Sequence, residues 1–361
     1  MSASRLSSRW SRFAKIAAGF GVSAFCLWWS AREMLGNPEE SLPRIARAFQ
    51  TANYWLLLPT WFALALFYWL KAWRWRLLLA PLGRFDPARE LVPPTMIGFA
   101  FNNLLPAHLG DFVRVFVFAR RHRLPKAAVL STVILERVFD VLAIVSFFGL
   151  GLFFVTGLDP LLKRTALIGG AAAAAMTLGA AAFVAWTDPF VRLAESILTR
   201  LPFVPPGLRA KFFELLESGA RGLSALHQPA LLIGIVALSL AQWALNGWMM
   251  HLALVSCGVQ VSLWVACVLL GAVAFAVTVP SSPGYVGVIQ LCFMSVLKLF
   301  TDDKEAVFAA SVLYHLAQYI PVTLIGLYYF GRTGLKVSDV RQQAESEAET
   351  PPVPAPEFPA G

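Results

Sequence analysis

The sequence predicts an all-α polytopic membrane protein with six full spans and two opposed, broken re-entrant hairpins, an inverted-repeat transporter-like arrangement. Of its 361 residues, 58% are hydrophobic and only 14% are charged, and the mean hydropathy is +0.64. A soluble domain carries about 25% charged residues. Long apolar runs separated by short basic loops are typical of membrane spans. This composition excludes an ordinary soluble enzyme and a disordered chain.

Six apolar segments are close to the length of about 20 residues that a full span requires. They cover residues 14–31, 54–71, 127–155, 166–186, 230–256 and 306–330. The first segment follows a basic stretch, as in a signal peptide. Because residues 30–33 (Ser-Ala-Arg-Glu) are not a convincing small-residue cleavage site, we expect an uncleaved span.

Two further apolar stretches, 92–119 and 262–298, are interrupted by polar, Pro and Gly residues. If the six spans alternate from a cytoplasmic N-terminus, the cytoplasmic loops hold 22 Lys and Arg and the outer loops seven. This bias obeys the positive-inside rule only if 92–119 enters and leaves from the cytoplasm and 262–298 from outside. The charges therefore predict one hairpin dipping in from each side, with both termini cytoplasmic. The simpler alternative is two pairs of short spans.

We expect one transmembrane domain over residues 1–335. Within it, the amphipathic segment 187–229 is predicted to lie along the cytoplasmic interface. The acidic, Pro-rich tail 336–361 cannot bury a core and is predicted to be disordered. The net charge of +9 lies mostly in short loops, so it indicates anionic lipid headgroups and not nucleic acid. The chain has no CxxC pair and no GxxxxGK[ST] loop, so we expect no metal, no cofactor and no ATP site.

The first group of candidate binding residues interrupts the stretch 92–119. It consists of Asn102, Asn103, Pro106, His108, Gly110, Asp111 and Arg114. Pro106 and Gly110 predict a helix break. A helix that restarts there points free N–H groups into the break, which suits an anion such as phosphate. Asp111 and Arg114 share a helix face, so Arg114 either pairs with Asp111 or binds a phosphate. The plainer interpretation is an ion pair at the membrane edge.

The second group lies inside the span 127–155 and consists of Glu136, Arg137 and Asp140. Each charge at a bilayer centre costs at least ~2.5 kcal/mol, so three in one span are not expected to face lipid. Glu136 and Asp140 are four residues apart on one face and can share a proton. They predict a polar path for a headgroup or a proton-coupling carboxylate. A structural network between helices is the alternative.

The third group interrupts the stretch 262–298 and consists of Ser281, Ser282, Pro283 and Gly284. Proline and glycine prevent a continuous helix here. Ser281 and Ser282 are predicted to cap the returning helix, with its N–H groups facing the other hairpin. A simple turn between two spans is the alternative.

Together these motifs resemble the flippase-like family of the lysylphosphatidylglycerol synthase transmembrane region. The matching segments are Asn103-Leu-Leu-Pro106 with Gly110-Asp-Phe-Val-Arg114, then Glu136-Arg-Val-Phe-Asp140, then Pro280-Ser-Ser-Pro-Gly284 with Gly287. The resemblance covers roughly residues 10–335 and implies movement of a lipid between leaflets, with the matching charged residues and hairpin tips along the headgroup path. The family's soluble aminoacyl-tRNA-dependent synthase domain has no counterpart in these residues, so lysyl transfer is not implied.

We therefore expect a translocase for a lipid with an anionic or isoprenoid-linked headgroup in the bacterial inner membrane. The alternatives are a membrane-embedded lipid-phosphate enzyme, using His108, Asp111 and Glu136, and a non-transporting scaffold for a lipid-modifying enzyme. The absence of a clear nucleophile argues against the enzyme. Expected partners are membrane lipids and a lipid-biosynthetic enzyme. A small-residue helix face at 169–179 permits a homodimer.

Overall fold

The computed structural model describes most of the predicted transmembrane domain as helices. The described residues are 21–30, 32, 38–105, 109–161, 163–164, 167–172, 175, 228–278 and 282–335. Most of the predicted span 166–186, nearly all of segment 187–229 and the whole tail 336–361 lie outside this part of the chain. Residues 21–30 are helical, in the C-terminal part of the first predicted span. The part of the chain that is described contains no strand, in agreement with the predicted all-α class.

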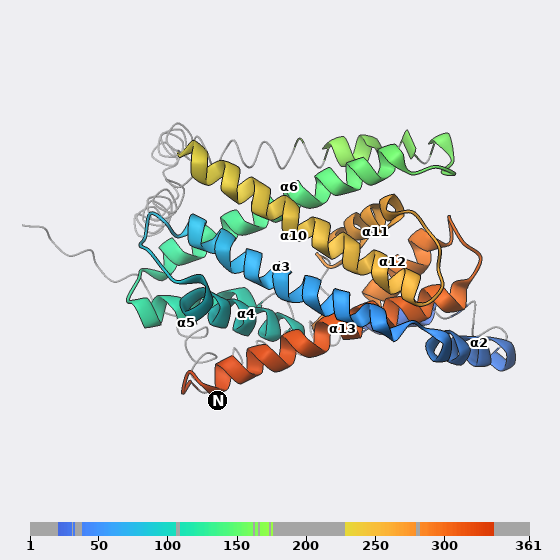
Figure 1. Cartoon of the computed structure of the whole chain (residues 1–361), viewed down its shortest axis with the longest axis horizontal. Coiled ribbons are helices and arrows are strands. Elements are labelled where there is room, and N and C mark those ends of the chain that lie inside the picture. Colours follow the sequence, from blue (N-terminus) through green and yellow to red (C-terminus); the bar gives the residue numbers. More distant parts are fainter. Residues whose placement is uncertain are drawn as a thin grey trace, which may run out of the picture.

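Four long helices run lengthwise through the molecule (Figure 1). They are α3 (Leu57–Leu78, preceded by the short turn η1, Tyr54–Leu56), α6 (Lys126–Phe154), α10 (Pro229–Ser256) and α13 (Lys304–Gly331). The segments Tyr54–Leu78, Pro229–Ser256 and Lys304–Gly331 are long and apolar enough to cross a membrane. The helix α6 is equally long but carries three charged residues near its middle. The protein is thus a helical membrane protein.

The helix α3 extends seven residues beyond the predicted end of its span at residue 71. Lys71 and Arg74, which the sequence places in a cytoplasmic loop, are buried within this helix. Arg114, which falls in the stretch 92–119 and is counted with the cytoplasmic charges, is buried within α5 (Leu109–His122). Three of the 22 basic residues counted as cytoplasmic therefore lie inside the helical core. Without these three residues, the predicted cytoplasmic loops still hold more Lys and Arg than the predicted outer loops.

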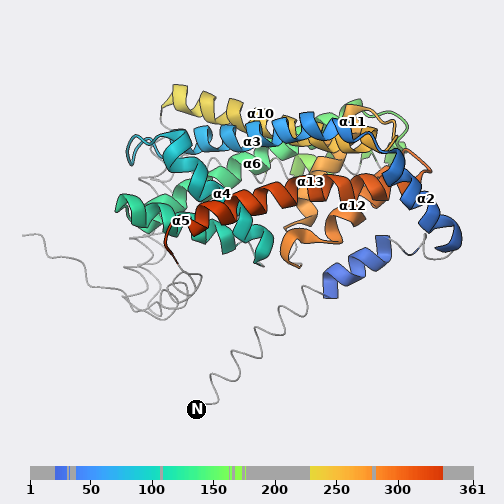
Figure 2. The same cartoon turned by 60° about the horizontal axis from the view of Figure 1, so that its bottom comes forward.

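Both interrupted stretches form two helices around a break, as the sequence predicts. The first consists of α4 (Val92–Leu104) and α5, and the second of α11 (Leu263–Ala276), the short turn η4 (Pro283–Tyr285) and α12 (Val288–Leu297). Figures 1 and 2 show α4 and α5 toward one end of the long axis and α11 and α12 toward the other. Their re-entrant placement in a membrane remains a prediction.

The two breaks lie beside each other in the middle of the fold. Gly284 has a φ of +74°, and a Cβ atom there would lie 2.5 Å from the Tyr319 ring and 3.4 Å from the carbonyl oxygen of Asn103. The side-chain amide of Asn103 donates a hydrogen bond to Thr323 Oγ1 at 2.9 Å. The helix α13 therefore holds the two breaks together, because it supplies both Tyr319 and Thr323.

The second break is also tied to the first helix of the chain. Ser23 Oγ donates a hydrogen bond to Ser282 Oγ at 2.7 Å, and the Ser282 N–H donates to Ser23 Oγ at 3.1 Å. The predicted cap of the returning helix is wrong for Ser282, because α12 begins after Gly287. There the Gln290 side chain folds back and accepts a hydrogen bond from the Gly287 N–H at 2.8 Å.

The helices α4 and α5 approach each other through glycine. A Cβ atom on Gly110 would overlap the carbonyl oxygen of Gly98, and one on Gly98 would lie 2.8 Å from Arg114 Cβ. This contact therefore requires glycine on both helices. The same close approach brings the Arg114 backbone into the core.

We predict that Gly110→Ala lowers the free energy of unfolding by about 1–3 kcal/mol, because the added methyl group forces α4 and α5 apart. Thermal unfolding of the purified protein in detergent measures the effect. Gly149→Ala is the matched control, because nothing lies within 4 Å of a Cβ atom at Gly149 in α6. The control is expected to be neutral or stabilising, since alanine favours a helix by up to about 1 kcal/mol. Equal stability of both variants would contradict the close contact.

Candidate functional site

Seven charged side chains from three helices form one ionic cluster in the interior. Its members are Lys71 and Arg74 on α3, Asp111 and Arg114 on α5, and Glu136, Arg137 and Asp140 on α6. The spacing of three or four residues within each helix puts the charges of that helix on one face. The three faces meet, so the charges are paired across helix interfaces.

Glu136 is the centre of the cluster. Its carboxylate lies 3.1 Å from Lys71 Nζ and accepts a hydrogen bond from Arg114 Nη1 at 3.1 Å. Arg114 Nη2 lies 3.0 Å from the second carboxylate oxygen, and Arg74 Nη2 lies 3.6 Å from the first. Glu136, Arg74 and Arg114 have no exposed side-chain surface. A single carboxylate therefore binds three cations from two other helices.

Asp140, one turn further along α6, connects the cluster to α10. Arg74 Nη1 lies 2.8 Å from Asp140 Oδ1, and Lys71 Nζ lies 3.2 Å from Oδ2. The Trp243 indole N–H donates a hydrogen bond to Oδ1 at 2.8 Å. Arg74 Nη1 also donates to Ser239 Oγ at 2.8 Å. Two residues of α10, Trp243 and Ser239, therefore add hydrogen bonds to the ion pair of Asp140 and Arg74.

The cluster has one partly open side, formed by Arg137 and Asp111. The guanidinium donates to both Asp111 oxygens at 2.7–3.1 Å, a two-pronged contact. The Asn102 side-chain amide donates to Asp111 Oδ1 at 3.2 Å. The side chains of Arg137 and Asp111 are 36% and 15% exposed, whereas the five other members are at most 3% exposed. We call this pair the rim of the cluster.

Aromatic rings shield the cations from the surrounding apolar core. The Arg114 guanidinium lies 3.7 Å from the Trp75 ring centre. Lys71 Nζ lies 5.5 Å from the Phe67 ring and 5.3 Å from the Phe99 ring, and Arg137 lies 5.6 Å from Phe99. Cations gain stability over aromatic faces, most strongly where water is excluded. The rings therefore favour a positive charge at this site.

Among the residues that the structure describes, the cluster contains one more cation than carboxylates. Four basic side chains face three acidic ones, so the formal charge is +1 with every group ionised. Two buried donor atoms, the Nε atoms of Arg74 and Arg114, also lack a hydrogen-bond partner, whereas the Nη2 atoms of these residues lie 3.6 and 3.0 Å from Glu136 oxygens. Burial of an uncompensated charge is costly. An anion bound at the rim would balance this charge.

The structure brings six of the predicted site residues into or against this cluster: Asn102, Asp111, Arg114, Glu136, Arg137 and Asp140. It pairs them differently from the sequence interpretation. Arg114 contacts Glu136, and Asp111 contacts Arg137, because the packing of α5 against α6 offers each charge a partner on the other helix. Glu136 and Asp140 share a face, as their spacing predicts, and they share Lys71 and Arg74 as cationic partners.

The other predicted site residues lie elsewhere. Asn103 and Gly284 form the contact between the two breaks, and Gly110 of α5 packs against Gly98 of α4. Ser282 is buried against the first helix, and Pro283 begins the short turn η4. Pro106, His108 and Ser281 lie outside the described residues.

Sequence reasoning missed Lys71, Arg74 and Trp243. Lys71 and Arg74 are three residues apart at the end of an apolar run, a spacing that puts both on one helix face. That spacing is the signal that would have found them. For Trp243, the sequence offers no sign of its bond to Asp140.

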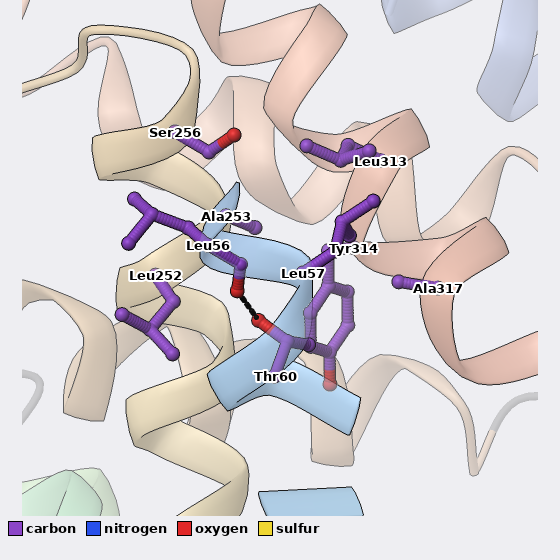
Figure 3. Close-up of a pocket in the computed structure, with 9 residues that line it drawn as sticks. All are labelled: Leu56, Leu57, Thr60, Leu252, Ala253, Ser256, Leu313, Tyr314 and Ala317. Atoms are coloured by element: carbon purple, nitrogen blue, oxygen red, sulfur yellow. Dashed lines mark hydrogen bonds between the residues drawn. The ribbon is translucent and has the colours of Figure 1, made fainter. Parts of the chain in front are cut away.

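A small depression lies apart from the cluster, between α3, α10 and α13 (Figure 3). Its lining is mostly apolar, and its polar members are Thr60, Ser256 and Tyr314. Thr60 Oγ1 donates to the Leu56 carbonyl at 2.7 Å, and the Tyr314 hydroxyl donates to Asn246 Oδ1 at 3.0 Å. These groups are satisfied within the protein and carry no charge. Among the described residues, no group of three or more His, Cys, Asp or Glu could hold a metal ion.

Comparison with known proteins places this chain in a family of membrane domains. Residues 16–326 match the family described as lysylphosphatidylglycerol synthase TM region, so the chain belongs to that family. It is 29% identical to the glycosyltransferase AglD of Haloferax volcanii over 287 residues, which cover 71% of this chain and 45% of that protein. It is 24% identical to the UPF0104 membrane protein MJ1078 of Methanocaldococcus jannaschii over 232 residues, which cover 63% and 92% respectively. The chain thus spans less than half of the length of the first relative.

We predict that Glu136→Ala destabilises the protein by about 3–5 kcal/mol, because it leaves three buried cations without their shared carboxylate. Thermal unfolding in detergent measures the loss. Glu40→Ala is the matched control: Glu40 lies 3.5 Å from Arg44 on α2 (Pro38–Thr51), and both side chains are more than half exposed. An exposed pair of this kind contributes at most about 1 kcal/mol. Equal unfolding temperatures for the two variants would show that the cluster does not stabilise the fold.

Proposed function

We propose that the protein moves a lipid with an anionic headgroup between the leaflets of a membrane. The observation that carries this proposal is the ionic cluster with its formal charge of +1 inside a bundle of apolar helices. A charge in a membrane interior is rare and marks a path for a polar substrate more often than a structural device. The rim of the cluster offers a planar guanidinium, which suits the oxygens of a phosphate.

The arrangement of the broken helices supports the same function. Irregular backbone inside a membrane is tolerated where it lies within protein or lines a cavity. Transporters built from opposed broken helices bind substrate near such breaks and open alternately to the two sides. We propose that the headgroup passes the rim and the neighbouring breaks while its apolar chains remain in the bilayer.

The family supports a role connected with membrane lipids, since its description refers to the membrane region of a phospholipid synthase. The headgroup class, the inner-membrane location and the cytoplasmic termini are part of the proposal. A lipid-biosynthetic enzyme is the partner that we propose, because a flipped lipid must be made on one side and used on the other.

The test is a flipping assay with purified protein in liposomes that contain a fluorescent phosphatidylglycerol, with a membrane-impermeant quencher outside. The wild-type protein is expected to expose the inner-leaflet probe to the quencher. We predict that Arg137→Ala slows this process by roughly tenfold, which corresponds to about 1.4 kcal/mol in the barrier, because the substitution removes the rim cation.

Arg332→Ala is the matched control, because Arg332 is an exposed arginine at the end of α13, away from the cluster. It is expected to flip at the wild-type rate. Thermal unfolding of Arg137→Ala is measured in parallel, so that loss of fold is separated from loss of activity. An equal rate for the two folded variants would contradict a role of the rim. Absence of flipping by the wild type would contradict the proposed function.

A further inference from the structure

The excess positive charge of the cluster can be removed in two ways. An anion can bind, or one of the four cations can release a proton. Arginine keeps its proton at any pH that a folded protein meets, whereas a buried lysine can release it. Lys71 is the one lysine among the four cations. We propose that Lys71 is a proton-exchange residue that links binding of a headgroup with one negative charge to uptake of a proton; this inference rests on the proposed function and adds its coupling to protons.

The surroundings of Lys71 fit this role. Its side chain is 1% exposed, and its Nζ lies 3.1 Å from Glu136 and 3.2 Å from Asp140. Arg74 faces it from its own helix, Arg137 from α6, and Arg114 from α5 through the shared Glu136. The helices α4 and α10 contribute the Phe99 ring and the indole of Trp243. Within the described part of the chain, these are the charged and hydrogen-bonding groups recorded around its ammonium.

Neither carboxylate loses all its cationic partners when Lys71 is neutral. Glu136 keeps Arg114 and Arg74, and Asp140 keeps Arg74, Arg137 and the Trp243 N–H. The neutral amine keeps its hydrogen bond to Asp140 Oδ2 and remains beside Glu136. Three arginines then balance three carboxylates, so the closed cluster carries no net charge and avoids the cost of burying one.

A bound headgroup reverses this balance. A phosphate diester at the rim brings one negative charge, and the cluster becomes neutral again only when the Lys71 amine takes a proton from water. The bond that forms is an N–H bond on Nζ, and the bond that breaks is an O–H bond of the water or hydronium that supplies the proton. Because linkage is reciprocal, a proton supplied on one side of the membrane favours loading of the lipid from that side.

The test measures proton uptake when the purified full-length protein in detergent binds short-chain phosphatidylglycerol in a weakly buffered solution with a pH indicator. The wild type is expected to take up about one proton per bound lipid near neutral pH. Lys71→Arg, which keeps the charge but cannot release a proton, is expected to bind the lipid without proton uptake. Lys71→Met is a second variant without the exchanging group. Lys298→Arg, at an exposed lysine following α12, is the control and keeps the wild-type uptake.

Undiminished uptake in both folded Lys71 variants would overturn the assignment, as would binding by the wild type without uptake. Short-chain phosphatidylcholine, which is zwitterionic, is expected to cause no uptake, and equal uptake with it would overturn the charge argument. The proposed function is judged separately by the flipping assay. Flipping without lipid-linked proton uptake would disprove only the role of Lys71, whereas binding of neither lipid would disprove the anionic substrate class as well.

Discussion

The ion pairing of Glu136 with cations from two other helices is the interaction on which the rest of this structure depends. Each of these charges alone would cost several kcal/mol in an apolar interior, so none of the three helices is expected to be stable there without the others. The contacts at 3.0–3.6 Å between Glu136 and its cations fix α3, α5 and α6 in one register. Asp140 extends the same restraint to α10 through Trp243.

Glycine residues allow α4 and α5 to approach closely enough for this pairing. A side chain at Gly98 would meet Arg114, and one at Gly110 would push α4 and α5 apart. The break before α5 also allows Asp111 to approach Asn102 and Arg137 at the rim. The first broken stretch therefore positions the charges, whereas the second contacts Asn103 and the first helix of the chain. The two breaks therefore differ in chemistry, although both interrupt an apolar stretch.

Much of the fold could be predicted, because apolar length and helix breakers are local properties. Helix breakers predict the breaks near Pro106 and Pro283. The spacing of Glu136 and Asp140 predicts that they share a face. The partners of these charges do not follow from spacing. The predicted span ended at Lys71, before Arg74, because a hydropathy argument counts every charge as unfavourable in a membrane. It does not take into account that a carboxylate more than 60 residues away in the sequence can pair with that charge. The same limitation left the pairing of Arg114 with Glu136 unpredicted.

The central claim is that the cluster, and not the surface of the protein, binds the lipid headgroup. Electron cryomicroscopy of the protein in nanodiscs that contain phosphatidylglycerol tests it most directly. Our account predicts density for a phosphate within hydrogen-bonding distance of Arg137, with the contact between Arg137 and Asp111 opened. Density for phosphates only at the outer ends of the helices, beside an intact contact between Arg137 and Asp111, would contradict it.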